Sequence, residues 1–411
     1  MSISANPTAS FAELGLDPDI VEVLVTLDIT TPFPIQQMAI PDALAGVDVC
    51  GKAKTGSGKT LAFGLPMVQR TTDAAPKRPR GLILVPTREL CMQVTTALEP
   101  FVKARGHELV AVYGGVPLKP QIKAISAGAE IVVATPGRLI DLIDRKAVSV
   151  EGVEIVVTDE ADEMADMGFL PQVHHIMRDV PKQAQVMLFS ATLDHRVQAL
   201  VRSYLQDPVY HEVESESKTV EESLHRFLEV HRMDKPKIVA RIAASATRTI
   251  VFVHTKRNAD AVARDLQDLD VPAQAIHGDI PQIKRERALA RLTKGNTTVL
   301  VATNVAARGI HIDGLDVVIH YDPPEDARTY LHRSGRTARA GEAGLVVTLV
   351  EWDQTQLVKR VQKEAGLHEP IVKMFSNDDR LDDLTGWQPP EREPDAPVRR
   401  SSRRRSRNRL L

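Results

Sequence analysis

The chain has 411 residues, 43% of them hydrophobic, which is enough for two or more domains with sizeable cores. Its net charge of −2 indicates no partner, but seven arginines and no acids lie between residues 399 and 409, a run that predicts contact with a polyanion. Cys50 and Cys91 form no paired motif, which favours a reducing compartment over a disulfide framework, and no signal-type start or membrane-length apolar run is found, so we expect a soluble, cytoplasmic protein.

Short apolar runs alternate with helical patterns along most of the chain, an order typical of βαβ units and of a parallel sheet. The runs are mostly apolar throughout, as expected for strands covered on both faces. The predicted strands are 81–85, 130–134, 154–158 and 185–189 in the first half, and 249–253, 297–302, 316–320 and 344–349 in the second. We therefore predict two α/β domains, residues 1–210 and 223–374, joined by a polar linker over 211–222. Residues 375–411, rich in Asp, Pro and Arg, are predicted to be a disordered basic tail.

A candidate phosphate loop, AKTGSGKT, occupies residues 53–60, between a strand-like and a helical segment. A glycine-rich loop in that position directs backbone N–H groups and a helix N-terminus at phosphates. Lys59 would reach the β- and γ-phosphates of ATP, and the Thr60 hydroxyl would bind Mg²⁺. Ala53 replaces the first glycine of the strict pattern, and an ordinary glycine–serine turn before a helix is the alternative. The other predicted nucleotide contacts in the loop are Thr55, Gly56, Ser57 and Gly58.

An acidic motif, DEAD, follows at residues 159–162, at the end of a predicted strand, where parallel α/β sheets place their ligands. Asp159 would bind Mg²⁺, directly or through water, and Glu160 would orient and deprotonate the attacking water. Alone, such a string is as readily a solvated acidic loop. About 100 residues after a phosphate loop, it predicts phosphoryl transfer, because that chemistry needs both a phosphate cradle and carboxylates for the metal and the water.

Six motifs in this order resemble those of the DEAD-box RNA helicases: AKTGSGKT, PTREL (86–90), TPGR (135–138), DEAD, SAT (190–192) and HRSGRTAR (332–339). The resemblance covers about residues 11–372. It implies two tandem RecA-like domains, each a mostly parallel sheet flanked by helices, that bind ATP between them. It also implies RNA-stimulated hydrolysis of ATP to ADP and phosphate, coupled to local unwinding of RNA duplexes or remodelling of RNP particles.

The resemblance extends to an adenine-reading segment at about residues 9–37. Gln36 would pair with adenine through its amide, and Phe11 would stack on the base, with a hydrophobic helix anchor as the alternative for Phe11. Phe33 stands where threonine is usual. Together these residues imply ATP in preference to GTP.

In the second domain, Arg336 and Arg339 match the family's arginine fingers, which are worth on the order of 10³ in rate or more. A basic helix facing RNA is the alternative for this pair. The residues implied to couple the ATP site to closure of the two domains are Asp162, Ser190, Thr192 and His332.

The residues implied to contact RNA are small, hydroxyl-bearing or arginine residues, which suit phosphates and 2′-OH groups and not base edges. They are Arg88, Gly115, Thr135, Gly137 and Arg138 in the first domain, and Gly278, Gln282, Arg285 and Thr303 in the second. Taken singly, each also fits an ordinary loop of any α/β fold. We predict a monomer that binds RNA independently of sequence, with RNP or ribosome-assembly factors as candidate partners and no membrane.

Two other functions fit much of the same pattern. One is an ATP-gated RNA clamp or scaffold that does not unwind, and the other is a DNA-directed translocase built on the same two domains. Gln36, Phe11 and the TPGR motif favour the RNA group. A small-molecule kinase would leave the second domain without a purpose.

Two residues depart from the family pattern, because Asn304 and His311 stand where aspartate is more usual. The aspartate at the position of His311 typically accepts hydrogen bonds from the ATP ribose. We therefore predict that His311 weakens ATP binding by about 1 kcal/mol, the typical value of one hydrogen bond, unless Asp313 compensates. His311→Asp should bind ATP about fivefold more tightly, and an unchanged affinity would show that this position makes no ribose contact.

Overall fold

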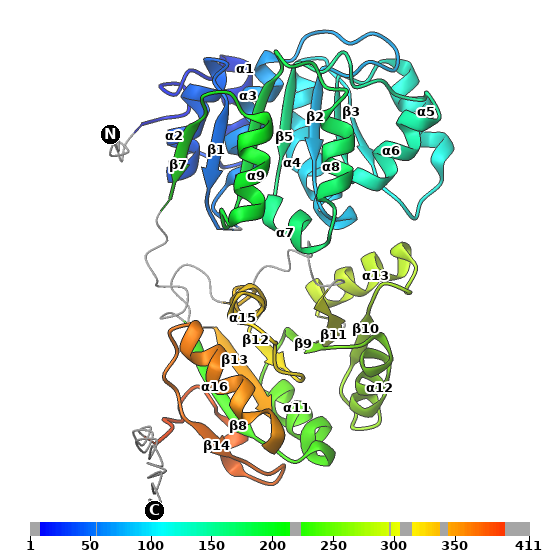
Figure 1. Ribbon diagram of the computed structural model, residues 1–411. Helices are drawn as coiled ribbons and strands as arrows, with labels where there is room; N and C mark the ends of the chain where they lie inside the picture. The colour runs from blue at the N-terminus through cyan, green and yellow to red at the C-terminus, as the bar shows by residue number, and fades with distance from the viewer. Residues whose placement is uncertain are drawn as a thin grey trace, which may run out of the picture.

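The computed structural model describes residues 9–54, 56–213, 223–295, 297–304, 315–337 and 344–390. They form two α/β lobes, which lie one above the other in Figure 1. Lobe 1 comprises the described residues up to 213, and lobe 2 those from 223 onward. Within these ranges, no helix is long and apolar enough to cross a membrane.

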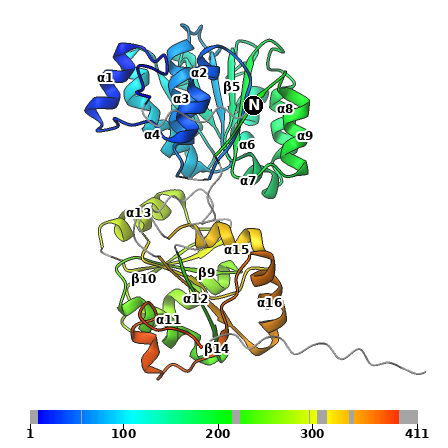
Figure 2. The same ribbon diagram turned by 90° about the vertical axis from the view of Figure 1, so that its left-hand side faces the viewer.

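Lobe 1 is built on a parallel sheet with the strand order β3-β4-β2-β5-β6-β1-β7. Its strands are β1 (Val49–Lys52), β2 (Gly81–Leu84), β3 (Leu109–Val112), β4 (Ile131–Ala134), β5 (Ile155–Thr158), β6 (Gln185–Ser190) and β7 (Val209–Glu212). Its helices are α1 (Pro18–Thr26), α2 (Pro34–Leu44), α3 (Lys59–Arg70), α4 (Arg88–Ala104), α5 (Leu118–Ala127), α6 (Pro136–Asp144), α7 (Ala161–Asp166), α8 (Leu170–Met177) and α9 (His195–Tyr204). Figure 2 shows helices on both faces of this sheet, with α2 and α3 on one side and α8 and α9 on the other.

This two-sided cover explains why the strands are apolar throughout. Successive residues of a strand point to opposite faces of the sheet, so Ile83 and Val157 join the core cluster that includes α3 and α4. Their neighbours Leu82 and Val156 join the cluster that includes α8 and α9. All four side chains are completely buried, so a polar residue at any of these positions would face a core.

Lobe 2 repeats the same topology, with the parallel order β10-β11-β9-β12-β13-β8-β14. Its strands are β8 (Leu224–Glu229), β9 (Thr249–Val253), β10 (Ala273–Ile276), β11 (Val299–Thr303), β12 (Val317–His320), β13 (Leu345–Val350) and β14 (Ile371–Lys373). Its α-helices are α11 (Lys235–Ala244), α12 (Lys256–Gln267), α13 (Gln282–Thr293), α15 (Ala327–Ser334) and α16 (Thr355–Glu364), and its short 3₁₀ helices are η1 (Arg232–Asp234), η2 (Trp352–Gln354) and η3 (Asp379–Asp382). Each strand of lobe 2 takes the place of the strand seven numbers lower in lobe 1, so the similarity of the lobes is one of architecture.

The predicted α/β fold with two parallel sheets is confirmed, and each of the eight predicted strands overlaps an observed one. The boundaries of the predicted linker and tail differ from those in the structure. His211 and Glu212, predicted to open the linker, complete β7, where they pair with Gly51 and Lys52 of β1. An edge strand needs no apolar run on its outer side, so a polar segment can form one. Residues 214–222 lie outside the described part of the chain.

The predicted tail also begins too early, because residues 375–390 pack on lobe 2. Leu381 and Leu384 are 1% and 3% exposed and belong to its core. The Arg226 guanidinium donates to the carbonyl oxygens of Leu384 at 3.0 Å and Trp387 at 2.8 Å. A few apolar side chains are enough to fasten a segment whose overall composition is polar. The arginine-rich residues 391–411 lie outside the described residues.

Candidate functional site at the boundary between the lobes

The phosphate loop leaves β1 at the carboxyl edge of the sheet and leads into α3. Gly56 and Gly58 have φ angles of +84° and +87°, in the left-handed region that glycine adopts without a steric penalty. Lys59 begins α3 and is 5% exposed, and Thr60 beside it is half-buried. The local conformation is therefore the one that a phosphate-binding turn needs. Thr55 lies outside the described residues.

Lys59 and Glu160 form a buried ion pair, with 2.8 Å between Nζ and Oε1 and side chains 5% and 7% exposed. Glu160 has a φ of +50°, a conformation that costs a non-glycine residue about 1 kcal/mol or more. Its backbone N–H donates to Oδ1 of Asp159 at 2.9 Å. Burial and the charge of Glu160 raise the pKa of Asp159 above its usual range, against the opposing effect of Lys59. The three predicted catalytic residues of lobe 1 thus lie together.

A magnesium ion would find few protein ligands here. Among the described residues, no group of three or more His, Cys, Asp or Glu side chains could hold a metal ion. Mg²⁺ characteristically binds one or two carboxylates and completes its shell with water and phosphate oxygens. The buried carboxylate of Asp159 and the hydroxyl of Thr60 fit that pattern, because they are hard oxygen donors at the mouth of the phosphate loop.

Gln36 contacts the phosphate loop directly. Its side chain is 1% exposed; Oε1 accepts from the Phe33 backbone N–H at 2.8 Å, and Nε2 donates to the Gly58 carbonyl at 3.0 Å. Each end of an amide can make one further hydrogen bond, so pairing with adenine is compatible with these contacts. The segment before α2 is in this way attached to the loop that would hold the phosphates.

Phe11 is buried in the core of lobe 1. It is 3% exposed and joins the core cluster that contains Leu14 and Leu16. Its ring anchors the N-terminal segment, as the alternative role considered for Phe11 expects, and stacking on the base stays a prediction. Phe33, at the N-cap of α2, is 54% exposed and is the aromatic side chain beside the phosphate loop.

The SAT residues hold the last aspartate of the DEAD motif. Asp162 is completely buried; its N–H donates to the Ser190 hydroxyl at 3.2 Å, and Oδ2 accepts from the N–H and the hydroxyl of Thr192 at 3.0 and 2.9 Å. Burial raises the pKa of Asp162, but the hydrogen bonds from Thr192 and Ser190 outweigh it and hold the pKa below its usual range. The predicted contact between the two motifs is present, and it keeps Asp162 ionised.

Helix α15 and the residues directly after it present three basic side chains to lobe 1, and Figure 1 shows α15 at the boundary below α7. Arg328 and His332 are four residues apart on one face of the helix, and Arg336 follows its C-cap residue, Gly335. Arg336 lies 3.8 Å from Glu163, and Arg328 lies 3.2 Å from Asp162. Burial lowers the pKa of His332 below its usual range, partly offset by the charge of Asp162. Arg339 lies outside the described residues.

Arg328 is a site residue that the sequence motifs missed. It precedes the HRSGRTAR motif by four residues and has no counterpart among the predicted site residues. The only signal was its spacing of four residues from His332, which places both on one face of α15.

The predicted RNA-contacting residues of lobe 1 gather around one turn. The guanidinium of Arg88 covers Gly115 so closely that an added Cβ would be 2.1 Å from its Nη1. Arg138 donates to the Val116 carbonyl at 3.3 Å. Thr135, half-buried, is the N-cap of α6, and Gly137 beside it is exposed. The structure therefore brings two arginines and two loop ends together at the carboxyl edge of the sheet.

In lobe 2, Arg285 is paired across the boundary, and its contact with RNA stays a prediction. Its side chain is 10% exposed and its Nη2 lies 2.8 Å from Oε1 of Glu89 in lobe 1, so it links the lobes instead of facing solvent. A buried glutamate needs a partner of opposite charge, and Arg285 provides one. Thr303 is 7% exposed at the end of β11, and Gly278 is exposed near Lys256. The side chain of Gln282 and the whole of His311 lie outside the described residues.

Asn304, one of the two departures from the family pattern, has a clear partner. Its Oδ1 accepts from Nε of Arg333 at 2.7 Å, and Arg333 also donates to the Asp322 carbonyl at 2.9 Å. Asparagine thus keeps a hydrogen bond at this position but supplies no negative charge to the buried guanidinium.

Comparison with known proteins gives a consistent answer. Residues 33–200 match the DEAD/DEAH box helicase family, and residues 234–341 match the helicase conserved C-terminal domain. The chain is 31% identical to a DEAD box protein from the hyperthermophile Methanococcus jannaschii, covering 89% of this chain and 99% of that one with a TM-score of 0.51. The chain belongs to the DEAD-box helicase family.

Two further similarities place this DEAD-box protein among its relatives. It is 40% identical over 366 residues to DEAD-box ATP-dependent RNA helicase 53 of Oryza sativa subsp. japonica, a match that covers 86% of this chain and 60% of the relative. The structure resembles S. cerevisiae Dbp5 bound to RNA and ADP BeF3, with a TM-score of 0.78, 28% identity and coverage of 92% of this chain and 98% of that one. The chain thus spans about three fifths of the length of the rice protein.

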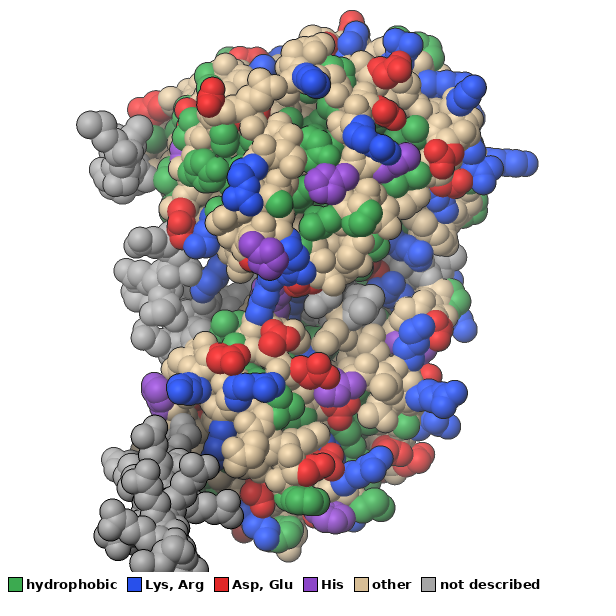
Figure 3. Space-filling view, in the orientation of Figure 1, with side chains coloured by type: hydrophobic (Ala, Val, Ile, Leu, Met, Phe, Trp, Pro, Cys, Tyr) green, Lys and Arg blue, Asp and Glu red, His purple; other side chains and the backbone are tan. Residues whose placement is uncertain are grey.

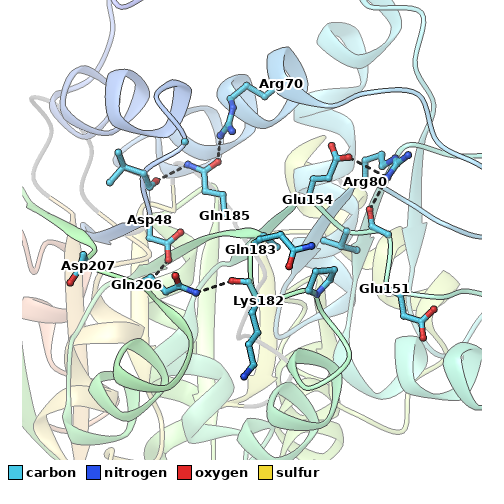
Figure 4. A pocket seen from close by; sticks show the side chains of 16 residues that line it. Asp48, Arg70, Arg80, Glu151, Glu154, Lys182, Gln183, Gln185, Gln206 and Asp207 are labelled. Atoms are coloured by element: carbon cyan, nitrogen blue, oxygen red, sulfur yellow. Dashed lines mark hydrogen bonds and ion pairs between the residues drawn. The ribbon is translucent and has the colours of Figure 1, made fainter.

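The DEAD-box site is separate from the cavity in Figure 4. That cavity, about 660 Å³, lies where the strands of lobe 1 begin, at the opposite edge of the sheet. Several of its polar groups already have partners: Gln185 donates to the Val47 carbonyl at 2.6 Å, and Asp48 accepts from the N–H groups of Val186 and Gln206 at 2.8 and 2.7 Å. These bonds hold the beginnings of the strands in place, and the predicted catalytic residues lie at the carboxyl edge instead.

The contact between Gln36 and the phosphate loop can be tested with two matched glycines. Gly58→Ala would place a Cβ 2.5 Å from Nε2 of Gln36 and 2.7 Å from the Phe33 ring, whereas Gly56→Ala would meet nothing within 4 Å. Both have similar φ angles, so the cost of left-handed alanine, about 1 kcal/mol, is common to both. We predict a melting temperature lower for Gly58→Ala than for Gly56→Ala by several degrees, from about 1–3 kcal/mol of overpacking.

Adding Gln36→Ala to Gly58→Ala should recover part of that difference, because it removes the side chain that the new methyl group meets. Equal melting temperatures for the two glycine variants would mean that Gln36 does not pack on the loop as described.

Proposed function

We propose that this DEAD-box protein is an ATP-dependent RNA helicase. It binds ATP between its lobes, hydrolyses it to ADP and phosphate when RNA is bound, and couples this to local unwinding of RNA duplexes or remodelling of RNP particles. The observation that carries the proposal is the meeting of three parts at one boundary. Lys59 of the phosphate loop pairs with Glu160 at 2.8 Å, Asp162 is held by SAT, and basic residues of lobe 2 reach the same motif.

Hydrolysis needs the ion pair between Lys59 and Glu160 to separate. The triphosphate is a stronger anion than one carboxylate, so ATP binding would draw Lys59 to its β- and γ-phosphates. Glu160 would then be a buried carboxylate without its cation, which makes it a better proton acceptor for the attacking water. Asp159 and Thr60 would hold Mg²⁺, which would neutralise phosphate charge. The ion pair would therefore keep Glu160 inactive as a base until ATP replaces Glu160 as the partner of Lys59.

Closure of the lobes would supply the remaining charge. Arg336, 13% exposed and 3.8 Å from Glu163, lies next to the DEAD motif, and a short movement along the boundary would bring it to the γ-phosphate. Arg339 is proposed to act with it. RNA would lie across both lobes, on the turn covered by Arg88 and Arg138 and on the exposed loop at Gly278. The similarity to S. cerevisiae Dbp5, which is bound to RNA and ADP BeF3, supports this arrangement.

The RNA contacts in this proposal involve phosphates and sugars, so binding is independent of sequence. The arginine-rich residues beyond 398 would add a salt-sensitive contact to the same polyanion. We further propose a cytoplasmic monomer that acts on RNP particles, with ribosome-assembly factors as candidate partners. Both cysteines are buried and free, as suits a reducing compartment.

An ATP-gated RNA clamp is the second candidate function. It is favoured by the links between the lobes, where Arg285 pairs with Glu89 and Arg328 with Asp162. Such links would hold RNA for as long as ATP remains unhydrolysed. A DNA-directed translocase would use the same lobes and is separated from the RNA enzyme by its response to DNA.

The proposal predicts ATP hydrolysis that single-stranded RNA stimulates and DNA of the same sequence does not. Glu160→Gln should keep ATP binding and lower kcat by about 10²–10⁴-fold, because general-base catalysis contributes on that order. Glu151→Gln is the matched control, since Glu151 is 68% exposed near the opposite edge of lobe 1 and makes the same chemical change there. Steady-state phosphate release with each nucleic acid is the measurement.

Equal stimulation by DNA would favour the translocase. ATP-dependent retention of RNA without hydrolysis would favour the clamp. Full activity of Glu160→Gln would contradict the assigned role of Glu160 in either enzyme.

A further inference from the structure

We propose that Arg328 is a positioning residue that transmits closure of the lobes to the DEAD carboxylates by holding the contact between Asp162 and Thr192. This inference rests on the proposed function and deepens it. It assigns to a residue outside the six motifs the task of joining lobe 2 to the SAT and DEAD motifs of lobe 1.

The contacts of Arg328 cross the boundary between the lobes at four points. Its Nη2 donates to the Thr192 hydroxyl at 2.9 Å and lies 3.2 Å from Oδ2 of Asp162. Its Nη1 lies 3.1 Å from Oδ2 of Asp194 and 3.4 Å from Oδ1 of Asp166. The Thr192 hydroxyl meanwhile donates to Asp162 at 2.9 Å. One guanidinium therefore contacts both partners of the SAT–DEAD hydrogen bond and the N-cap residue of α9.

The charges explain why an arginine belongs at this point. Asp162, Asp166 and Asp194 lie close together in lobe 1, and Arg196 is the lobe 1 cation that pairs with Asp166 and Asp194, at 2.6 and 2.8 Å. The side chains of the three aspartates are only 1%, 18% and 24% exposed. Three carboxylates beside one guanidinium leave a net charge of −2, which Arg328 reduces to −1. Partly buried charges need such partners, so lobe 1 presents a site that attracts a cation.

The state of the acids supports this attraction. Burial raises the pKa of Asp194, but its hydrogen bonds with the Val197 N–H and the Arg196 side chain outweigh burial and keep that pKa well below its usual range. Asp162 is likewise kept ionised by Thr192 and Ser190. Both carboxylates are charged at neutral pH and available to Arg328 whenever the lobes approach.

Contact at Arg328 also bears on where His332 lies. The two residues are one turn apart on one face of α15, about 6 Å along the axis, and Arg336 follows directly after the helix's C-cap residue, Gly335. A helix is rigid over one turn, so contact at Arg328 helps to fix how His332 lies near Asp162 and where Arg336 leaves the helix beside Glu163. Arg285 also crosses the boundary, but it pairs with Glu89 and does not contact the DEAD motif. Arg328 is thus the described cross-lobe side chain that contacts both SAT and DEAD.

The test compares Arg328→Ala, Arg328→Lys and Arg196→Ala in the full chain, with poly(U) as the RNA. We expect Arg328→Ala to lower the RNA-stimulated kcat about tenfold, a typical size for coupling between sites. KM for ATP should change little, because the contacts of Arg328 in the described part of the chain are with Thr192, Asp162, Asp166 and Asp194 and not with predicted ATP-binding residues. Arg328→Lys should recover only part of kcat, since one ammonium group cannot reach Thr192, Asp162 and Asp194 together. Arg196→Ala removes a cation from the same acids without cutting the link between lobes, so its kcat should fall less.

A second readout does not depend on activity. The Thr192 N–H donates to Asp162, so hydrogen exchange over residues 190–194 reports on this contact. With a non-hydrolysable ATP analogue and poly(U) bound, exchange there should be faster in Arg328→Ala than in the native chain. If the native chain shows no RNA-stimulated hydrolysis, the proposed function fails while the exchange experiment still decides the role of Arg328.

Three results would overturn the inference. One is a native kcat together with native exchange in Arg328→Ala. Another is equal loss of kcat in Arg328→Ala and Arg196→Ala, which would mean that only the number of charges matters. A third is a loss confined to KM for ATP, which would make Arg328 a nucleotide-binding residue.

Discussion

The burial of the DEAD carboxylates is the constraint on which the rest of the site depends. Asp159, Glu160 and Asp162 are 2%, 5% and 0% exposed, and three negative charges cannot remain there without compensation. Lys59 compensates Glu160 from within lobe 1, while Arg328 reaches Asp162 from lobe 2. The two lobes therefore attract each other electrostatically, because lobe 1 supplies carboxylates and lobe 2 supplies guanidinium groups.

The topology makes that approach productive. In parallel sheets the loops that bind ligands leave the carboxyl ends of the strands. In lobe 1 the phosphate loop follows β1, the DEAD motif follows β5 and SAT closes β6, and these three strands are neighbours in the sheet. In lobe 2, α15 follows β12, the counterpart of β5. Two copies of one architecture thus place the acids and the arginines at facing edges, as the positions of α7 and α15 in Figure 1 show.

Charged side chains of both signs lie at the surface along this boundary. In Figure 3, basic side chains (blue) lie close to acidic ones (red) along the groove between the lobes. Such pairs are worth little when fully exposed, but the side chains of Arg285 and Glu89 are 10% and 8% exposed. The links between the lobes therefore respond to anything that changes charge at the boundary, and a triphosphate is such a change.

Much of the fold could be predicted because strands buried on both faces leave a continuous apolar run, as in Ile83 with its neighbours. Edge strand β7 is partly exposed and polar, and edge strand β14 is only three residues long and partly exposed, so neither has that signature. The motifs likewise predicted that Lys59 and Glu160 lie in one site and that Thr192 pairs with Asp162. The burial of Phe11 and the pairing of Arg285 with Glu89 were not foreseen, because residue type alone does not distinguish a solvent-facing loop from a buried partner or anchor. Arg328 escaped notice because its meaning depends on lobe 1, which no local pattern around residue 328 encodes.

The most direct test of the account measures the distance between the lobes. Cys50 and Cys91 are buried, so fluorophores can be attached to new cysteines at Lys123 of lobe 1 and Asp268 of lobe 2, both exposed. The account predicts that energy transfer is greatest with a non-hydrolysable ATP analogue and RNA together, and lower with the analogue and DNA of the same sequence. Transfer that is the same with and without ATP analogue and RNA would contradict the claim that these ligands bring the two charged edges together.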